Sequence, residues 1–540
     1  MGQLPDRQRS QELNSGAPKI ARGPGLLRST AVFSAMTLLS RIAGFVRDQL
    51  QATLFGTGGA MSAFIIAYRI PNFLRRVFAE GSMAMAFVPV LNEIKERGDK
   101  AALKDFIDHM AGALCAVVLV VCGIGVLLAP AITGLFAFGW IDEPAKFALT
   151  THMLRITFPY LLFISMMSLA ASVLNSFGKF ALPAFTPVLH NLTLIAAMLW
   201  LAPRFDVKPV GLAWGVLIAG ALQLMLLWPA LGRLGLRPRL RLGFRHPEVR
   251  RVSRLMLPTL FSSSVAQVNL LVGTAFAALL VDGSVDWLYY SDRLIEFPLG
   301  LFGVAIGTVI LPHLSRRFAA ADAEGYTRSL DWGLRLALLA GVPAGLGLLL
   351  LADPITATVY NYGEFTALDT RMSAISLTAM SIGIPAFMLS KVLSPAFFAR
   401  QDTKTPMRAA IITVIANVVL TIAFTTPLLL NKVEGAHVGI ALATALAGIV
   451  NAALLWHYLR RAGMYAPQPG WRGFSIRLLL ACVAMTAVVL ALRFWVGDWT
   501  AMDNPFDRVS WLLLVIAAGA AAYGLMLLAT GLRPRDLRGR

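Results

Sequence analysis

Long apolar segments separated by short polar loops make up most of this chain of 540 residues. Each segment is about 20 residues or longer, which is the length that an α-helix needs to cross a membrane. The segments are unbroken runs rich in Leu, Ala, Val and Ile, whereas transmembrane β-strands would alternate apolar and polar residues. The pattern therefore predicts an all-α polytopic membrane protein with about fourteen transmembrane helices. The predicted spans are 30–55, 61–92, 107–137, 148–176, 182–202, 209–231, 253–280, 286–315, 327–352, 367–399, 406–430, 436–459, 474–496 and 509–531.

Composition and charge placement support this prediction and orient the helices. Hydrophobic residues make up 57% of the chain and charged residues 14%, with a mean hydropathy of +0.68. The net charge is +19, and most Lys and Arg lie in alternate loops, above all between Arg233 and Arg254. Because basic loops remain cytoplasmic, we expect both termini in the cytoplasm. Basic loops also contact anionic membrane lipids, so we expect no nucleic-acid partner.

An internal repeat divides the chain. The segment YRIPNFLRRVFAEGSMAMAFVPVL, from Tyr68, is echoed by YSDRLIEFPLGLFGVAIGTVILPHL, from Tyr290, and Asn191 aligns with Asn417 in a second echo. The repeat predicts two six-helix lobes of equal orientation that bind substrate between them and expose it alternately by rocking. The predicted parts are a polar cytoplasmic tail (1–28), an N-lobe (29–232), a basic cytoplasmic loop (233–252), a C-lobe (253–462), a helix pair (463–532) and a basic cytoplasmic tail (533–540).

Five arginines lie within two of the N-lobe spans. They are Arg41, Arg47, Arg69, Arg75 and Arg76. A guanidinium at the centre of a bilayer costs roughly 3 kcal/mol or more, so these side chains must face protein, water or an anion. The spacing of Arg69, Arg76 and Glu80 places them on one helical face. In the C-lobe, Arg293 is the corresponding basic candidate.

Acidic residues near these arginines could pair with them. The candidate supporting acids are Asp48, Glu80, Asp292 and Glu296. Internal ion pairs would join Arg47 to Asp48, Arg76 to Glu80 and Arg293 to Glu296. However, five N-lobe arginines face only two of these acids, and an excess of buried positive charge favours an anionic ligand. Arginine in particular favours phosphate or carboxylate, held through two N–H groups.

Three residues are candidate hinges. Arg41 and Arg47 project about 120° apart on an ideal helix, so a bend near Gly44 would let both meet one ligand. Pro71 and Pro298 interrupt helices in the two halves and each removes a backbone hydrogen bond. Cysteine and histidine show no ligand spacing, so we expect no metal site and no cofactor, and no catalytic residue is assigned.

The chain resembles the MurJ (MviN) family of bacterial lipid II flippases. The resemblance rests on SRIAGFVRDQLQATLFGTGGAMSAFIIAYRIPNFLRRVFAEGSMAMAFVPVLNE, on WLYYSDRLIEFPLGLFGVAIGTVILPHLSRRF and on PAFFARQDTKTPMR. It implies the multidrug/oligosaccharidyl-lipid/polysaccharide exporter superfamily, with two C-terminal helices beside a groove for a lipid tail. The implied substrate is lipid II, an undecaprenyl-pyrophosphate-linked muropeptide moved from the inner to the outer leaflet of the cytoplasmic membrane for peptidoglycan assembly.

The resemblance also assigns residues. Family arginines regarded as essential correspond to Arg41, Arg47, Arg75 and Arg293, while Arg69 matches a commonly basic position and Asp48 and Glu80 match family acids. Where relatives often read ATDAFFVA, this chain reads AMSAFIIA, which places Ser62 at an aspartate position. A mechanism that needs a carboxylate at that position is therefore not expected here.

The chain has no GxxxxGK[ST] sequence, so we expect a coupling ion or the membrane potential, rather than ATP, to supply energy. Two other functions fit the same architecture. A multidrug antiporter would need cavity carboxylates for organic cations, and a membrane enzyme acting on polyprenyl phosphates would need acid–base or metal-binding groups. A scaffold with a vestigial transport fold is a third alternative.

Overall fold

The computed structural model describes residues 24–76, 83–502 and 504–532 and is helical, with no strand in those ranges. The N-lobe contains α2 (Pro24–Phe55), α3 (Gly59–Arg75), α4 (Met83–Glu96), α5 (Lys100–Leu127), α6 (Ala129–Phe136), α7 (Pro144–Thr157), α8 (Tyr160–Ser176), α9 (Ala181–Ala196) and α10 (Lys208–Arg233). The C-lobe contains α11 (Pro247–Ala277), α12 (Ser284–Pro298), α13 (Val304–Ala319), α14 (Ala323–Leu350), α15 (Ala352–Tyr360), α16 (Ala367–Ser381), α17 (Ile384–Phe398), α18 (Lys404–Leu430) and α19 (Val438–Arg461). The chain continues with α20 (Trp471–Val496) and α21 (Pro505–Ala529).

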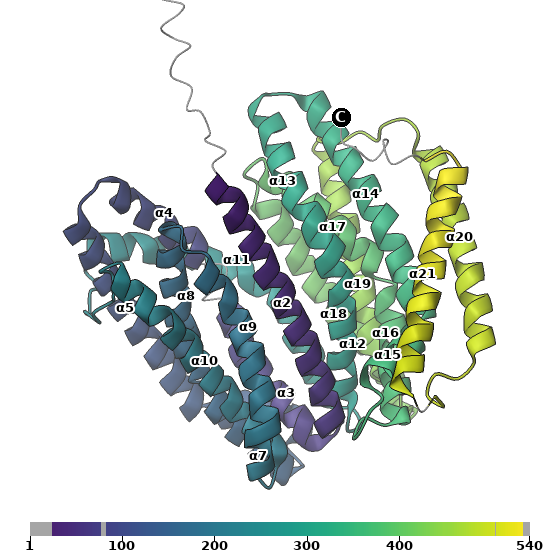
Figure 1. The fold of residues 1–540 in the computed structure, drawn as a ribbon, viewed down its shortest axis with the longest axis horizontal. Helices are drawn as coiled ribbons and strands as arrows, with labels where there is room; N and C mark the ends of the chain where they lie inside the picture. The colour runs from purple at the N-terminus through teal and green to yellow at the C-terminus, as the bar shows by residue number, and fades with distance from the viewer. Residues whose placement is uncertain (1–23, 77–82, 503, 533–540) are drawn as a thin grey trace, which may run out of the picture.

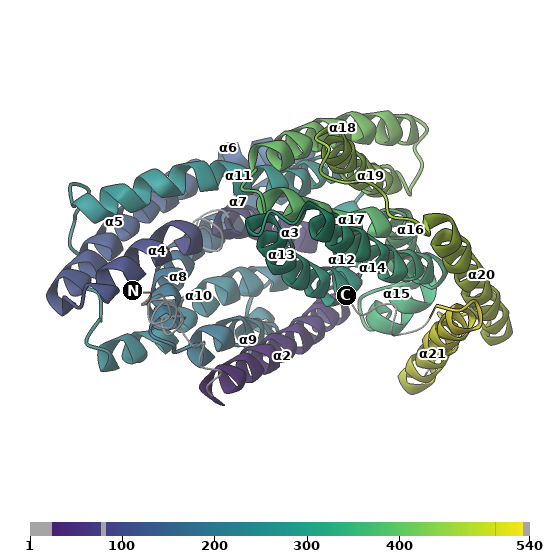
Figure 2. The same ribbon diagram turned by 90° about the horizontal axis from the view of Figure 1, so that it is seen from above.

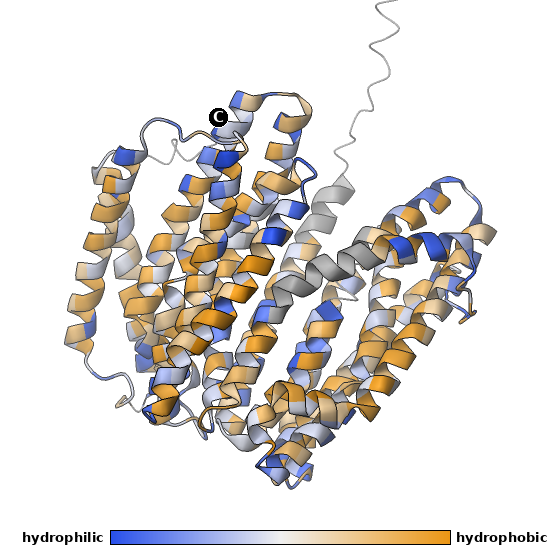
Figure 3. Ribbon diagram, turned by 180° about the vertical axis from the view of Figure 1, so that it is seen from behind, coloured by the Kyte–Doolittle hydropathy of each residue, from blue (hydrophilic) through white to orange (hydrophobic). Residues whose placement is uncertain are grey.

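Ten helical segments in the described ranges are long and apolar enough to cross a membrane, or eleven if the bent pair α16 and α17 counts as one span. The all-α membrane fold is therefore confirmed, whereas the number of fourteen spans stays a prediction. The axes of α16 and α17 meet at 45°. Along the helices, hydrophobic residues dominate, and hydrophilic residues gather at the loops and helix ends (Figure 3).

The two lobes stand side by side and diverge toward the end of the molecule where α2 begins (Figure 1). They converge at the opposite end, where α2 leads into α3. The described chain begins and ends on the diverging side (Figure 1). Seen from above, α20 and α21 form a separate pair at the outer edge of the C-lobe (Figure 2), where they pack against α14 and α15.

Packing repeats between the lobes as the sequence echoes suggest. In the N-lobe α9 packs on α2, and in the C-lobe α18 packs on α11. Asn191 of α9 donates to the carbonyl of Ser40 in α2 (3.0 Å), while Asn417 of α18 lies 3.5 Å from Asn269 of α11. Helix α11 also contacts α4, α5 and α6, and therefore joins the two lobes.

Candidate functional site

Arg47 lies in the last third of α2 and is held on two sides. Its guanidinium pairs with Asp48 (Nη2 to Oδ1, 2.6 Å) and donates from Nη1 to Oδ1 of Asn191 on α9 (2.9 Å). The two charged side chains are 12% and 10% exposed. The internal pair between Arg47 and Asp48 that the sequence allowed is therefore present. Burial of Arg47 and Asp48 in α2 is tolerated because each of the two charged groups has a partner.

Arg41 lies six residues before Arg47 on the same helix and is more exposed. It donates to the carbonyl of Gly300 in the C-lobe (3.4 Å), so it reaches across the lobe boundary. A Cβ at Gly300 would lie 2.2 Å from Nη1 of Arg41, so a side chain there would require this exposed guanidinium to move. Gly44 lies in uninterrupted helix beside Asn191, and its function as a hinge stays a prediction.

Arg69 of α3 is buried between the lobes. It pairs with Asp292 of α12 (3.4 Å) and donates to the hydroxyl of Thr274 on α11. Its guanidinium also lies 5.7 Å from the ring centre of Tyr289 on α12. Three contacts with the C-lobe therefore come from one N-lobe arginine. Asp292 is the ion-pair partner of Arg69, and its function as a supporting acid for substrate binding stays a prediction.

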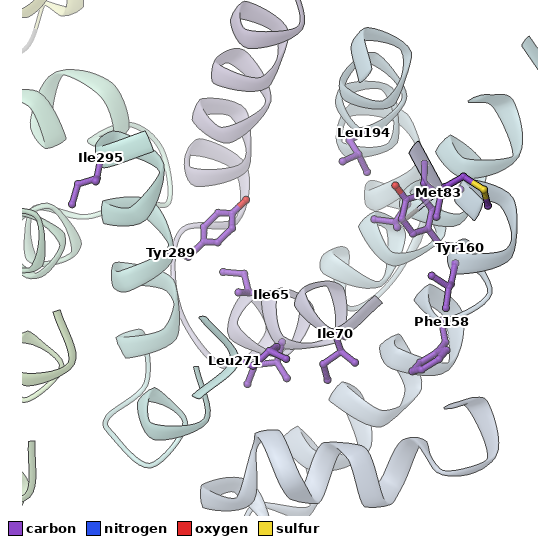
Figure 4. Packing of buried hydrophobic residues seen from close by; sticks show 14 of the residues in the cluster. Ile65, Ile70, Met83, Phe158, Tyr160, Leu194, Leu271, Tyr289 and Ile295 are labelled. Carbon is purple, nitrogen blue, oxygen red and sulfur yellow. The ribbon is translucent and has the colours of Figure 1, made fainter. Parts of the chain in front are cut away.

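Arg293 follows Asp292 and pairs with Glu296 (2.8 Å), which confirms the second internal ion pair. Its guanidinium lies 5.1 Å from the ring centre of Tyr289. The Tyr289 hydroxyl lies 3.4 Å from Asp48, so Tyr289 links both arginines to the acid of α2. Figure 4 shows this ring projecting from α12 toward the N-lobe, near Ile65. Tyr289 was not among the residues predicted from the sequence, although residues four apart on a helix lie on one face and Tyr289 precedes Arg293 by four.

The remaining described candidates lie in the second half of α3 and at the end of α12. Arg75 donates from Nε to Asn72 (2.9 Å), and both Arg75 and Arg76 are partly buried and have further interactions. Glu80 lies outside the described residues, so its pairing with Arg76 stays a prediction. Pro71 is buried inside α3. Pro298 is the last residue of α12, where the chain changes to the π-helical turn Leu299–Gly303.

These residues do not form one compact cluster. Arg47, Arg69 and Arg293 converge around Tyr289 together with Asp48 and Asp292. Arg41 lies nearer the start of α2, and Arg75 and Arg76 end α3. The six arginines and the three described acids leave a formal excess of positive charge along the junction of the two lobes.

The lobes meet closely where α2 joins α3. Gly56 (φ +59°) and Gly58 (φ +129°) have backbone angles that favour glycine, and they allow the sharp reversal between the helices. A Cβ at Gly56 would lie 2.5 Å from the carbonyl oxygen of Glu364 in the C-lobe. The amide of Glu364 in turn donates to the carbonyl of Thr53 (3.0 Å). Backbone contact therefore closes the molecule at this end.

The family model described as "Lipid II flippase MurJ" matches residues 51–508. The chain belongs to this family. A probable lipid II flippase MurJ of Vibrio cholerae is 42% identical over 520 residues, covering 95% of this chain and 98% of the relative. The lipid II flippase MurJ of Burkholderia cenocepacia is 39% identical over 522 residues, covering 95% and 99%.

Solved structures agree with this assignment. A MurJ structure in an inward closed conformation has a TM-score of 0.78 and 28% identity, covering 94% of this chain and 99% of that one. A multidrug resistance MATE family transporter of the MOP superfamily, in an inward-facing conformation, has a TM-score of 0.61 at 14% identity, covering 80% and 98%. The second likeness shows a common fold.

This member of the MurJ family contains one group of polar residues that spacing along the sequence did not predict. His109 of α5 and His246, just before α11, stack with ring centres 5.1 Å apart. Both lie close to Asp105 Oδ2, at 3.3 Å and 3.4 Å. Arg241 also pairs with this carboxylate. The group attaches the basic connection between the lobes to α5, and no pattern within a single segment would predict it.

Proposed function

We propose that this protein translocates lipid II from the inner to the outer leaflet of the bacterial cytoplasmic membrane. The observation that carries the proposal is membership of the lipid II flippase MurJ family in a chain whose lobe junction is lined with arginines. The protein is a transporter rather than an enzyme. Its multi-pass fold would lie in the inner membrane with both termini in the cytoplasm, where the basic loops would be retained.

The arginines suit the head group of this substrate. A lipid pyrophosphate carries about two negative charges, and a guanidinium can donate two parallel N–H groups to phosphate oxygens. Arg47, Arg69 and Arg293 pair with carboxylates in this structure. We infer that phosphate oxygens replace some of these carboxylates and that Arg41, Arg75 and Arg76 supply further positive charge.

The two lobes suit alternating access. In this structure the lobes diverge on the side that carries the basic loops and meet at the other end (Figure 1). We propose that this side is cytoplasmic and that the head group enters between the lobes from there. Rocking about Gly44, Pro71 and Pro298 would then open the opposite end.

The isoprenoid tail would remain in the hydrocarbon region beside α20 and α21. This pair exposes large apolar side chains to lipid, including Phe494, Trp495 and Leu525. The membrane potential, worth about 2.3 kcal/mol per elementary charge per 100 mV, could return the positively charged site to its starting state.

The decisive experiment reconstitutes the purified protein in vesicles and measures lipid II that becomes accessible on the opposite leaflet. We expect translocation by the unaltered protein and a loss of at least tenfold in Arg293→Ala. Arg328→Ala is a matched control, because Arg328 is an exposed arginine paired with Glu324 on the same helix, α14, which packs against C-lobe helices and α20. Transport of organic cations without movement of lipid II would instead support a multidrug antiporter.

A further inference from the structure

Two carboxylates of the C-lobe are buried where the lobes close. Asp286 of α12 is 0% exposed and Asp369 of α16 is 6% exposed. Both accept hydrogen bonds from the short connection between α2 and α3 in the N-lobe. The two carboxylates differ in the number of hydrogen-bond donors that each of their oxygens meets.

Asp369 has donors on both oxygens. Its Oδ1 accepts from the hydroxyl of Thr57 (2.5 Å) and from Nε1 of Trp287 (2.8 Å). Its Oδ2 accepts from the backbone N–H and the hydroxyl of Thr366, at 2.8 Å and 2.7 Å, as part of the cap of α16. Four donors can stabilise a buried negative charge.

Asp286 has donors on one oxygen. Its Oδ2 accepts from the amide of Gly58 (2.8 Å) and from the hydroxyl of Ser62 (2.7 Å), both in the N-lobe. Its Oδ1 is buried and meets no hydrogen-bond partner among the described residues. The neighbouring hydroxyl of Ser284 is also buried without a partner there. A negative charge on Asp286 would therefore be only partly satisfied in this buried contact.

The charged and titratable groups around Asp286 offer no compensation. Lys146 of α7 already pairs with Asp282 and Glu143, and Arg69 of α3 pairs with Asp292. From α16, Asp369 presents a like charge. The hydroxyl of Tyr290 lies beside the carbonyl of Gly56, and His437 of α19 bonds to the carbonyl of Met372. No ion pair of Asp286 occurs in the described part of the chain.

We propose that Asp286 binds one proton on Oδ1 when the lobes close at this end and releases it to water when they open. The neutral acid keeps Oδ2 as an acceptor for Gly58 and Ser62 while removing the buried charge. Opening separates Asp286 from both donors and hydrates it, which favours the charged form. This proposal rests on the proposed alternating access and names the proton as the coupling ion.

The pairing also accounts for Ser62. The family pattern often has an aspartate where this chain has Ser62, and the structure places the carboxyl of Asp286, on α12, within hydrogen-bond distance of the Ser62 hydroxyl. One carboxyl at this contact is sufficient for proton binding, whichever lobe carries it. A second one at position 62 would bring two acids within hydrogen-bond distance in a site without a cation.

The test measures closure directly. Spin labels at Ile141 in the N-lobe and Leu368 in the C-lobe, both exposed, would report the distance between the lobes in lipid vesicles from about pH 5 to 9. Closing takes up a proton, so the ratio of closed to open protein should rise as pH falls, by up to about tenfold per pH unit. Asp286→Asn is neutral at every pH and should stay closed with less than a twofold change.

Two controls make the result specific. Asp498→Asn removes an exposed carboxylate in the connection between α20 and α21 and should keep the pH dependence, as should Asp286→Glu with a displaced midpoint. An unchanged pH response in Asp286→Asn, or no response in the unaltered protein, would overturn the proposal. The spin-label experiment contains no lipid II, so failure of lipid II translocation would count against the proposed function alone.

Discussion

The pair formed by Arg47 and Asp48 offers the sharpest test of whether an arginine binds substrate or supports the fold. Arg47→Ala would remove the cation paired with Asp48, whose side chain is 10% exposed, and would leave the Tyr289 hydroxyl at 3.4 Å from that carboxylate. Removing one partner of a buried ion pair costs about 3–5 kcal/mol of stability. We therefore expect this variant to unfold at a clearly lower temperature than the unaltered protein and to lose translocation.

The double variant Arg47→Ala/Asp48→Asn separates the two effects. The neutral amide no longer needs a cation, so most of the lost stability should return, to within about 1 kcal/mol of the unaltered protein. Translocation should not return, because the guanidinium that would hold the pyrophosphate is still missing. Thermal unfolding of the purified variants and lipid II translocation in vesicles measure the two quantities separately. Recovery of both stability and translocation would refute a substrate-binding function for Arg47.

Three further predictions concern Arg293, a disulfide between the lobes and the orientation of the loops. Arg293→Lys keeps the charge without the planar N–H pair and should translocate lipid II slowly, whereas Arg293→Ala should be inactive; equal rates for Lys and Arg would exclude paired N–H contacts with phosphate. A disulfide between Gly59→Cys and Asp282→Cys should stop translocation until it is reduced, because a Cβ at Gly59 lies 3.8 Å from the Asp282 carboxylate of the other lobe; full activity with the bridge formed would argue against rocking. In intact cells, an impermeant thiol reagent should label a cysteine at Asp282 but not one at Arg245, and labelling at Arg245 would reverse the proposed orientation.

Helix positions were largely predictable because hydropathy is a local property. The predicted spans 406–430 and 436–459 correspond to α18 (Lys404–Leu430) and α19 (Val438–Arg461). Breaks and bends inside the spans could not be predicted from hydropathy. The predicted span 286–315 consists of α12, a π-helical turn after Pro298 and α13, and the span 367–399 bends by 45° between α16 and α17. Apolar runs report total length and leave the direction of the helix axis open.

Ion pairs between neighbours in sequence were also predictable. Arg293 and Glu296 are three residues apart, so helical spacing places them on one face, and Arg47 and Asp48 are adjacent in sequence. The pair of Arg69 with Asp292 was not, since helical periodicity places a residue on one face of its own helix and leaves the opposing helix unknown. For the same reason, the contacts of Tyr289 of the C-lobe with Asp48 and Arg69 of the N-lobe could not be predicted.

The amino-acid sequence by itself determined that this is a helical membrane protein of the lipid II flippase family with an unusual number of arginines in its spans. Both properties follow from the kinds of residue present and from short-range order along the chain. Only the tertiary structure decided that Arg69 of the N-lobe meets Asp292 of the C-lobe, and that Ser62 faces Asp286 across the closed end of the lobes. Those contacts join residues more than 200 positions apart, and packing of the two lobes brings them together.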